Sequence, residues 1–261
     1  DKSDKSLLLV VGQAGQGKST LVAKVVEVID YPTVWVNVDP FDNDPPSFLI
    51  GLMAAFTNKW DRLDFAPLLN NLGTRVSAEN AQAVYVLWAR NFWQVAPDTV
   101  RIVLDALEQV PEKSQTYLLI EALIQYAPSS ARFVLVSRSR PPLKVERLII
   151  DGKAFVIENA AMAFSSDEIA LFLEHYPLFS LDDELVSLIS TYTEGWLVGI
   201  IIIVQWLSRD KSYSRIAQLQ ERLKNGAPRE IITYFAEEVF NSLDSEERHF
   251  LIKTAFLETL E

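Results

Sequence analysis

The residues with the clearest chemical potential form a glycine-rich loop near the amino terminus. Residues Gly12–Thr20 match the pattern G-x-x-x-x-G-K-[ST]. The loop follows the apolar run Leu7–Val11 and precedes a stretch with apolar residues at helical spacing. In such a strand–loop–helix unit, backbone N–H groups and the positive end of the helix dipole bind polyphosphate. The sequence therefore predicts a nucleotide-binding loop rather than a turn that only joins strand to helix.

Each part of this loop has a predicted role. The glycines let backbone N–H groups turn toward the phosphates of ATP or ADP. The Lys18 amino group would reach the β- and γ-phosphates, and the Ser19 hydroxyl would bind Mg²⁺. The predicted cofactor-binding residues are Gly12, Gln13, Ala14, Gly15, Gln16, Gly17, Lys18, Ser19 and Thr20.

A second candidate for metal binding is Asp105. It directly follows Arg101–Leu104, four residues suited to a central strand. An aspartate at this position of a P-loop protein holds Mg²⁺, usually through a water, opposite the loop serine. The alternative is an ordinary strand-terminal aspartate that caps the next turn. We expect Asp105 and Ser19 to form the metal site.

Hydrolysis also requires a carboxylate that orients or deprotonates water. The position after Asp105 is Ala106, so the next available acid is Glu108. Asp39, at the end of a neighbouring predicted strand, competes with Glu108 for this role. Glu108 is the preferred candidate. If neither acid reaches the site, the protein is a slow ATPase or a switch that only binds nucleotide.

A third chemical candidate is Arg138, which ends another predicted strand. A guanidinium beside the phosphate loop would bind the γ-phosphate and favour the triphosphate state. Arg140 lies in the same turn but further from the strand. The alternative for Arg138 is a surface arginine paired with one of the many acids. The predicted catalytic residues are thus Glu108, Asp39 and Arg138.

Strands that alternate with helices predict an α/β fold with a doubly wound parallel sheet and helices on both faces. In such a sheet, ligands bind at the carboxyl ends of the strands. Pro67 and Gly73 are expected to break the chain between helices. The expected strands span residues 7–11, 33–38, 100–104 and 133–136, with further candidates at 148–150 and 154–157, and the expected helices span 47–62, 78–95 and 114–126.

The pattern becomes helical from about residue 160. Ser165 and Glu168 have the spacing of a capping box. Further helices are expected at 181–192, 195–207, 212–224, 229–241 and 245–254, with a break at 225–228. The expected domains are a P-loop nucleotide-binding domain (1–159), a helical domain (160–225) and the start of a truncated winged-helix domain (226–261).

Composition narrows the function further. The net charge is −11, which disfavours direct nucleic-acid contact by this segment. There is no cysteine, so thiolate chemistry is excluded. The apolar segment 196–207 is shorter than the roughly 20 residues that a bilayer requires, so we expect a buried helix and no membrane contact. These features, with no visible signal peptide, favour a cytoplasmic location.

Several segments together resemble the STAND class of P-loop ATPases, and within it the ATPase module of large bacterial transcription activators of the maltose-regulon type. The resemblance extends over nearly the whole chain. The segments that carry it are 12–20, 35–43, 136–143, 163–169, 193–200, 234–240 and 250–257. Two positions depart from the family pattern. Ala106 replaces the second of the family's paired aspartates, so that the segment Asp105–Glu108 is more similar to the NACHT branch, where acids follow a small residue. Leu197 stands where a proline often follows Gly195-Trp196.

The resemblance implies a signal-transduction switch in transcription regulation. In this class, ADP holds the domains closed, whereas ATP and an inducer open them for oligomerisation, and a separate carboxyl-terminal domain acts on DNA. The implied partners are ATP or ADP with Mg²⁺, other copies of the protein and an unknown inducer. Two alternatives remain: an interaction scaffold or defence-type NACHT-like protein with a structural nucleotide, and a P-loop enzyme that acts on a separate substrate.

Overall fold

The computed structural model describes residues 6–73, 76–77, 79–176, 183–209, 233–234, 236–237, 240 and 245–254. The chain divides into two compact units. The first comprises Asp1–Gln13 and Lys18–Ala161, and the second comprises Ala14–Gly17 and Met162–Glu261. Four residues of the glycine-rich loop therefore belong with the carboxyl-terminal unit.

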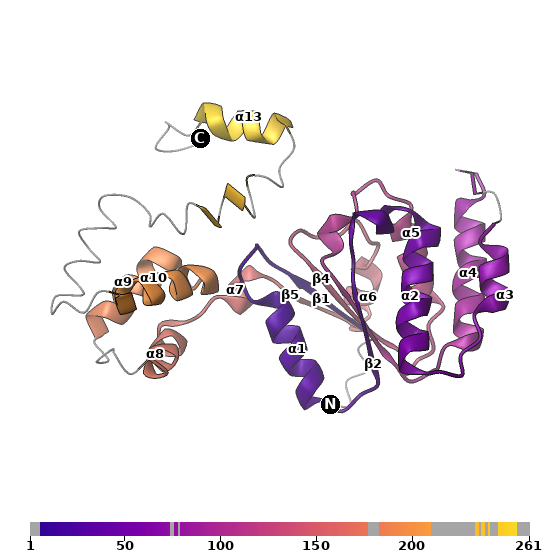
Figure 1. Ribbon diagram of the computed structural model, residues 1–261, viewed down its shortest axis with the longest axis horizontal. Helices are drawn as coiled ribbons and strands as arrows, with labels where there is room; N and C mark the ends of the chain where they lie inside the picture. The colour runs from indigo at the N-terminus through magenta and orange to yellow at the C-terminus, as the bar shows by residue number, and fades with distance from the viewer. Residues whose placement is uncertain are drawn as a thin grey trace. The chain divides into compact units, whose positions relative to one another are not determined.

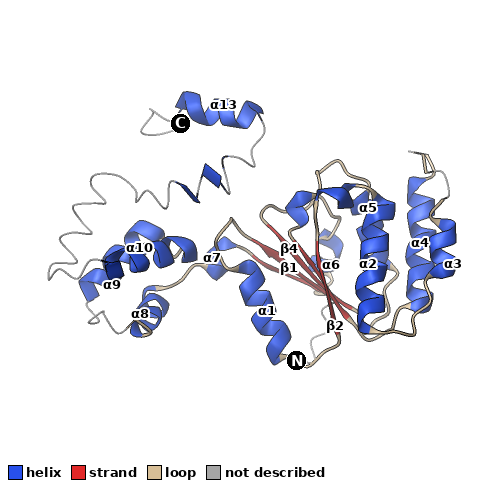
Figure 2. Cartoon of the chain, viewed as in Figure 1, coloured by secondary structure: helices blue, strands red, loops and turns tan. Residues whose placement is uncertain are grey.

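The first unit is built on a parallel sheet of five strands in the order β2-β3-β4-β1-β5 (Figure 2). The central strands are almost continuously apolar because helices cover both faces of a parallel sheet. The strands are β1 (Leu7–Val11), β2 (Thr33–Asn37), β3 (Arg101–Asp105), β4 (Arg132–Ser137) and β5 (Ala154–Ile157). The predicted doubly wound α/β fold is confirmed.

Helices lie on both sides of this sheet, with α1 (Lys18–Val28) on the side opposite α2 and α4 (Figure 1). The main core lies between the sheet and the layer that contains α2 and α4. Trp88 and Phe92 of α4 are fully buried there. Trp93 is 8% exposed, so the six scattered tryptophans include at least two core residues. The other helices of the unit are α2 (Pro45–Lys59), α3 (Ala66–Asn71), α4 (Ala81–Val95), α5 (Thr116–Gln125) and α6 (Glu146–Ile150), with short 3-10 helices η1 (Pro40–Asn43) and η2 (Leu107–Gln109).

Two local expectations are wrong. The strand candidate at 148–150 is the end of helix α6, in which Leu148 and Ile149 pack against the core while Ile150 is 83% exposed. A short apolar run has too few residues to distinguish the two periodicities. Pro67 does not break the chain but lies in the first turn of α3, where proline needs no hydrogen-bond donor.

The second unit has its own apolar core. Its helices are α8 (Ser166–Glu174), α9 (Asp183–Thr193), α10 (Leu197–Arg209) and α13 (Ser245–Thr254), while the short α7 (Asn159–Met162) spans the division between the units. The Ser165–Glu168 capping box is confirmed, because each side chain accepts a hydrogen bond from the other residue's backbone N–H. Ile200, Ile203 and Val204 of α10 are buried, as expected for the apolar segment.

Among the described residues, no helix combines the length and apolar character needed to cross a bilayer. The expected helix at 212–224 and the break at 225–228 lie outside the described residues, as do most of the expected helix at 229–241 and much of the expected winged-helix segment 226–261.

The main core contains an aromatic cluster that offers a test of the fold. Phe56 is fully buried, with edge-on ring contacts to Phe65 and Phe92 at centroid distances of 6.4 and 5.0 Å. We expect Phe56→Ala to lower the free energy of unfolding by about 3–5 kcal/mol, because it removes this surface and leaves a cavity. The control Phe41→Ala, at a side chain 82% exposed, should change it by less than about 0.5 kcal/mol. Urea unfolding measures both, and equal effects would contradict the packing described.

Candidate functional site

The carboxyl ends of three adjacent strands bring the chemical candidates together. Val11 of β1 lies in register with Ser137 of β4, so Gly12 and Arg138 leave the sheet at the same level. The Gly12 N–H donates to the Ser137 carbonyl at 3.1 Å. Asp105 ends β3 on the other side of β4. The sequence-predicted residues from three distant segments therefore share one edge of the sheet.

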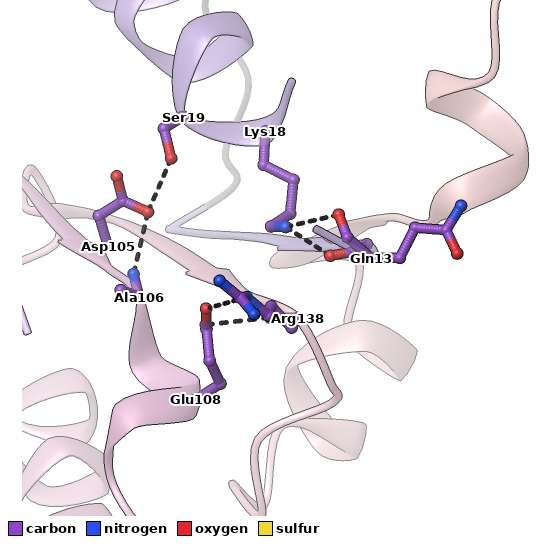
Figure 3. Close-up of polar contacts among 8 residues, drawn as sticks. Gln13, Lys18, Ser19, Asp105, Ala106, Glu108 and Arg138 are labelled. Atoms are coloured by element: carbon purple, nitrogen blue, oxygen red, sulfur yellow. Dashed lines mark hydrogen bonds and ion pairs between the residues drawn. The ribbon is translucent and has the colours of Figure 1, made fainter. Parts of the chain in front are cut away.

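Lys18 is the first residue of α1 and lies half-buried against the loop backbone. Its ammonium donates to the carbonyls of Gly12 and Gln13, the latter at 3.0 Å (Figure 3). Burial lowers the pKa of Lys18, while the nearby Glu108 and Asp105 carboxylates act in the opposite direction and Arg138 adds to the decrease. The pKa of Lys18 thus depends on the charges of Glu108, Asp105 and Arg138.

Ser19 and Asp105 face each other. The Ser19 hydroxyl donates to Asp105 Oδ1 at 3.1 Å, and the same oxygen accepts the Ala106 backbone N–H at 2.9 Å (Figure 3). A hydroxyl and a carboxylate at this separation are oxygen donors of the type that Mg²⁺ prefers. Asp105 also caps its own turn, so the two interpretations of this residue are compatible.

The turn after Asp105 has an unusual backbone. Ala106 has φ 63° and ψ 39°, the left-handed conformation that L-residues other than glycine, asparagine and aspartate rarely adopt. This residue reverses the chain from β3 into η2, where Glu108 lies. The sequence pattern contained no signal for this conformation, because alanine is not typical of it.

Glu108 and Arg138 form an ion pair with two contacts. Glu108 Oε1 lies 3.0 Å from Arg138 Nε, and Glu108 Oε2 accepts the Arg138 backbone N–H at 3.0 Å (Figure 3). The side chains are 18% and 31% exposed, respectively. Arg138 therefore pairs with an acid, as the alternative interpretation of this residue expected, and that acid is the one predicted to activate water. The sequence did not indicate which acid it would be.

Asp39 has a different use in this structure. Its Oδ1 accepts the Phe41 N–H at 2.7 Å, while its own N–H donates to Asp42 Oδ2 at 2.9 Å. The second bond belongs to the capping box at the start of η1, in which the Asp39 side chain also accepts the Asp42 N–H. Burial raises the pKa of Asp42. Asp39 thus lies at the carboxyl end of β2 as expected, with one carboxylate oxygen engaged in a cap.

The remaining loop residues differ in exposure. Gly12, Ala14 and Gln16 are buried, whereas Gln13 and Thr20 are exposed. Gly15 and Gly17 have φ values of 75° and 84°, which explains the need for glycine at both positions. The Gln13 N–H donates to Asn159 Oδ1 at 3.0 Å, a contact that no sequence pattern predicted.

No protein-family model matches this chain. Over 97% of its length, it is 26% identical to the HTH-type transcriptional regulator MalT of Vibrio parahaemolyticus, and the match covers 27% of that protein. The predicted resemblance to this type of regulator is confirmed. The chain is also 27% identical to the serine/threonine-protein kinase PknK of Mycobacterium tuberculosis, over 97% of this chain and 22% of the kinase.

The chain thus spans about a quarter of the length of the curated relatives that it matches. Among solved structures, it is similar to AMPPCP-bound DnaA from Aquifex aeolicus, with 12% identity, a TM-score of 0.47 and coverage of 93% of this chain and 66% of the other. That likeness is too low to carry an argument about function.

The electrostatics of the site can be tested at Glu108. Replacing this acid with a neutral amide, Glu108→Gln, removes a negative charge that partly offsets the lowering of the Lys18 pKa by burial. We therefore expect the pKa of Lys18 to fall further below its ordinary value, measured by NMR titration of its ε-carbon. Glu27→Gln, which neutralises an exposed acid paired with Lys24, is the control and should leave the Lys18 titration unchanged. A rise in the Lys18 pKa upon Glu108→Gln would contradict the arrangement.

Proposed function

We propose that this chain is the nucleotide-binding switch module of a multidomain regulator, which binds ATP or ADP with Mg²⁺. The observation that carries this proposal is the arrangement of Lys18 and Ser19 at the start of α1, with Ser19 Oγ 3.1 Å from Asp105 Oδ1. The resemblance to MalT-type regulators supports it.

In this proposal, loop N–H groups and the Lys18 ammonium bind the β- and γ-phosphates. Mg²⁺ would be held by Ser19 and Asp105, where it would neutralise part of the phosphate charge. The site then supplies two cationic side chains, Lys18 and Arg138, and two acidic ones, Asp105 and Glu108. Because ATP carries one more phosphate than ADP, only ATP would reach the second cation.

Arg138 is the proposed sensor of the γ-phosphate. Its guanidinium is held by Glu108 in this structure, so the γ-phosphate would compete with that carboxylate. A ligand shifts a conformational equilibrium only through a difference in its affinity for the two states. Exchange of the Arg138 partner would provide such a difference between ATP and ADP.

Hydrolysis in this proposal is slow. Glu108, the preferred water-activating acid, is engaged with Arg138, and Asp39 is engaged in its cap. Glu108 would become available only when Arg138 turns to the γ-phosphate. We propose a switch with slow hydrolysis rather than an enzyme with rapid turnover, because Ala106 follows Asp105 in place of a second acid and both candidate acids have other partners before nucleotide binds.

The wider function is inferred from the relatives. As part of a longer cytoplasmic STAND-type protein, the module would transmit an inducer signal to transcription through self-association in the ATP state. The proposed domains are the P-loop domain (1–159), a helical domain (160–225) and the start of a winged-helix domain (226–261). DNA would be bound by a domain outside this chain, since the net charge of −11 disfavours direct contact.

Removal of the loop lysine tests nucleotide binding. We expect Lys18→Ala to weaken both MgADP and MgATP by at least about tenfold, since a charge-assisted hydrogen bond contributes roughly 1.5–3 kcal/mol. Calorimetric titration measures the loss. Lys24→Ala, two turns along the same helix and exposed, is the matched control and should bind as the unmodified protein does. Unchanged affinity in Lys18→Ala would sink the P-loop interpretation.

The sensor role has its own test. Arg138→Ala should weaken a non-hydrolysable ATP analogue by roughly ten- to hundredfold while leaving ADP nearly unchanged. ATP-dependent association, followed by light scattering, should weaken in parallel. Arg140→Ala removes a neighbouring, more exposed arginine that pairs with Glu146, and serves as the control. Equal losses for both nucleotides would count against Arg138 as a γ-phosphate sensor.

Identical oligomeric states of the unmodified protein with ADP and ATP would instead favour a scaffold with a structural nucleotide.

A further inference from the structure

The carbonyl groups of the glycine-rich loop have specific partners within the second unit, which includes Ala14–Gly17. The indole N–H of Trp196 donates to the Ala14 carbonyl at 2.9 Å. The backbone N–H of Val198 donates to the Gly15 carbonyl at 3.1 Å. Two successive loop carbonyls are thus each held by a donor, one from the residue before α10 and one from the first turn of α10.

These bonds determine which way the loop amides point. The described peptide bonds include no cis bonds, and a trans peptide directs its C=O and N–H to opposite sides. Fixing the Ala14 carbonyl therefore aims the Gly15 N–H away from Trp196. Fixing the Gly15 carbonyl likewise aims the Gln16 N–H away from Val198. Phosphate-binding loops use N–H groups of this kind as donors to the ligand.

Trp196 is itself firmly positioned. Its ring lies 5.6 Å from that of Tyr234 and over Gly199, where an added Cβ would come within 2.6 Å of the Trp196 ring. The preceding Gly195 has φ 77°, and its carbonyl accepts the Phe164 N–H at 3.0 Å. A Cβ at Gly195 would come within 2.5 Å of the Phe164 carbonyl. The turn before Trp196 therefore requires glycine, and the indole has little freedom to move.

The loop glycines allow the loop backbone to pack closely against residues at the start of α10. A Cβ at Gly15 would lie 2.6 Å from Val198 Cγ2, and one at Gly17 would lie 2.9 Å from Leu197 Cδ2. Gly15 and Gly17 are thus required for packing against the start of α10, in addition to their positive φ values.

We propose that Trp196 is a positioning residue for nucleotide binding: through its indole N–H, together with the Val198 amide, it holds the loop carbonyls so that the Gly15 and Gln16 amides face the phosphates. This inference rests on the proposed nucleotide binding. It differs from the Arg138 proposal because the α- and β-phosphates are common to both nucleotides. Loss of the Trp196 bond therefore affects ADP and ATP equally.

The test removes the donor and keeps the ring. Trp196→Phe should weaken MgADP and a non-hydrolysable MgATP analogue by the same factor, about three- to tenfold, in calorimetric titrations. In ¹⁵N NMR spectra without nucleotide, the Gly15 and Gln16 amide signals should shift. Trp93→Phe is the matched control, because the Trp93 indole N–H also donates to a backbone carbonyl, that of Leu123, at 2.9 Å. It should lower thermal stability and leave nucleotide affinity unchanged.

Other outcomes overturn the inference. The inference is wrong if Trp196→Phe leaves nucleotide affinity unchanged or weakens only the ATP analogue. It is also wrong if Trp93→Phe weakens nucleotide binding as much as Trp196→Phe does. If Trp196→Phe does not fold, β-(3-benzothienyl)alanine inserted at position 196 replaces only the indole N–H with sulfur, and the same losses are expected. Absence of nucleotide binding by the unmodified chain would refute the proposed function and this inference together, whereas binding that tolerates the Trp196 changes would refute this inference alone.

Discussion

The parallel pairing of β1 with β4, and of β4 with β3, holds the candidate site together. These three strands are distant in the sequence, yet their in-register hydrogen bonds bring their carboxyl ends to one edge. A slip by one residue would move every side chain of a strand to the opposite face of the sheet and disrupt its packing against the helices. Gly12, Asp105 and Arg138 owe their proximity to this register rather than to any contact of their own.

The charges gathered at this edge are balanced. Lys18 and Arg138 provide two positive groups, and Asp105 and Glu108 provide two negative groups, in a chain whose net charge is −11. Since half-buried charges interact more strongly than exposed ones, each affects the others. The lowered pKa of Lys18 reflects this competition between burial and neighbouring charge. An anion that binds at such a site must compete with existing contacts, such as the Glu108–Arg138 ion pair, because the site has no excess of positive charge.

Much of the fold follows from sequence patterns that are local. The apolar runs predicted β1, β3 and β4, and the capping box predicted the start of α8 at Ser165. The segment at 148–150 was predicted wrongly, because three apolar residues satisfy both a strand and a short helix. Pro67 was also misjudged, because proline is found in the first turn of a helix as well as at breaks between helices.

For the site too, the sequence predicted where some residues lie but not which residues contact each other. The loop motif located Lys18 and Ser19 at one end of the sheet, and the position of Asp105 after a predicted strand located it at the same end, where the structure also has them. Neither pattern could predict that Glu108 contacts Arg138, or that Trp196 contacts Ala14, 182 positions away in the sequence. Such pairings depend on side-chain directions and on turns, which no spacing rule encodes. Their functional roles remain predictions that the experiments above address.

The left-handed backbone of Ala106 has a consequence for the precision of this site. An alanine in that conformation costs roughly 1 kcal/mol relative to glycine, which adopts it without steric conflict. Glycine, however, would also enlarge the set of conformations open to the unfolded chain and to the turn itself. Alanine therefore trades a small amount of folding free energy for a stiffer corner between β3 and η2. A stiff corner limits how far Glu108 can drift, so that the carboxylate meets the Arg138 guanidinium repeatedly in one orientation.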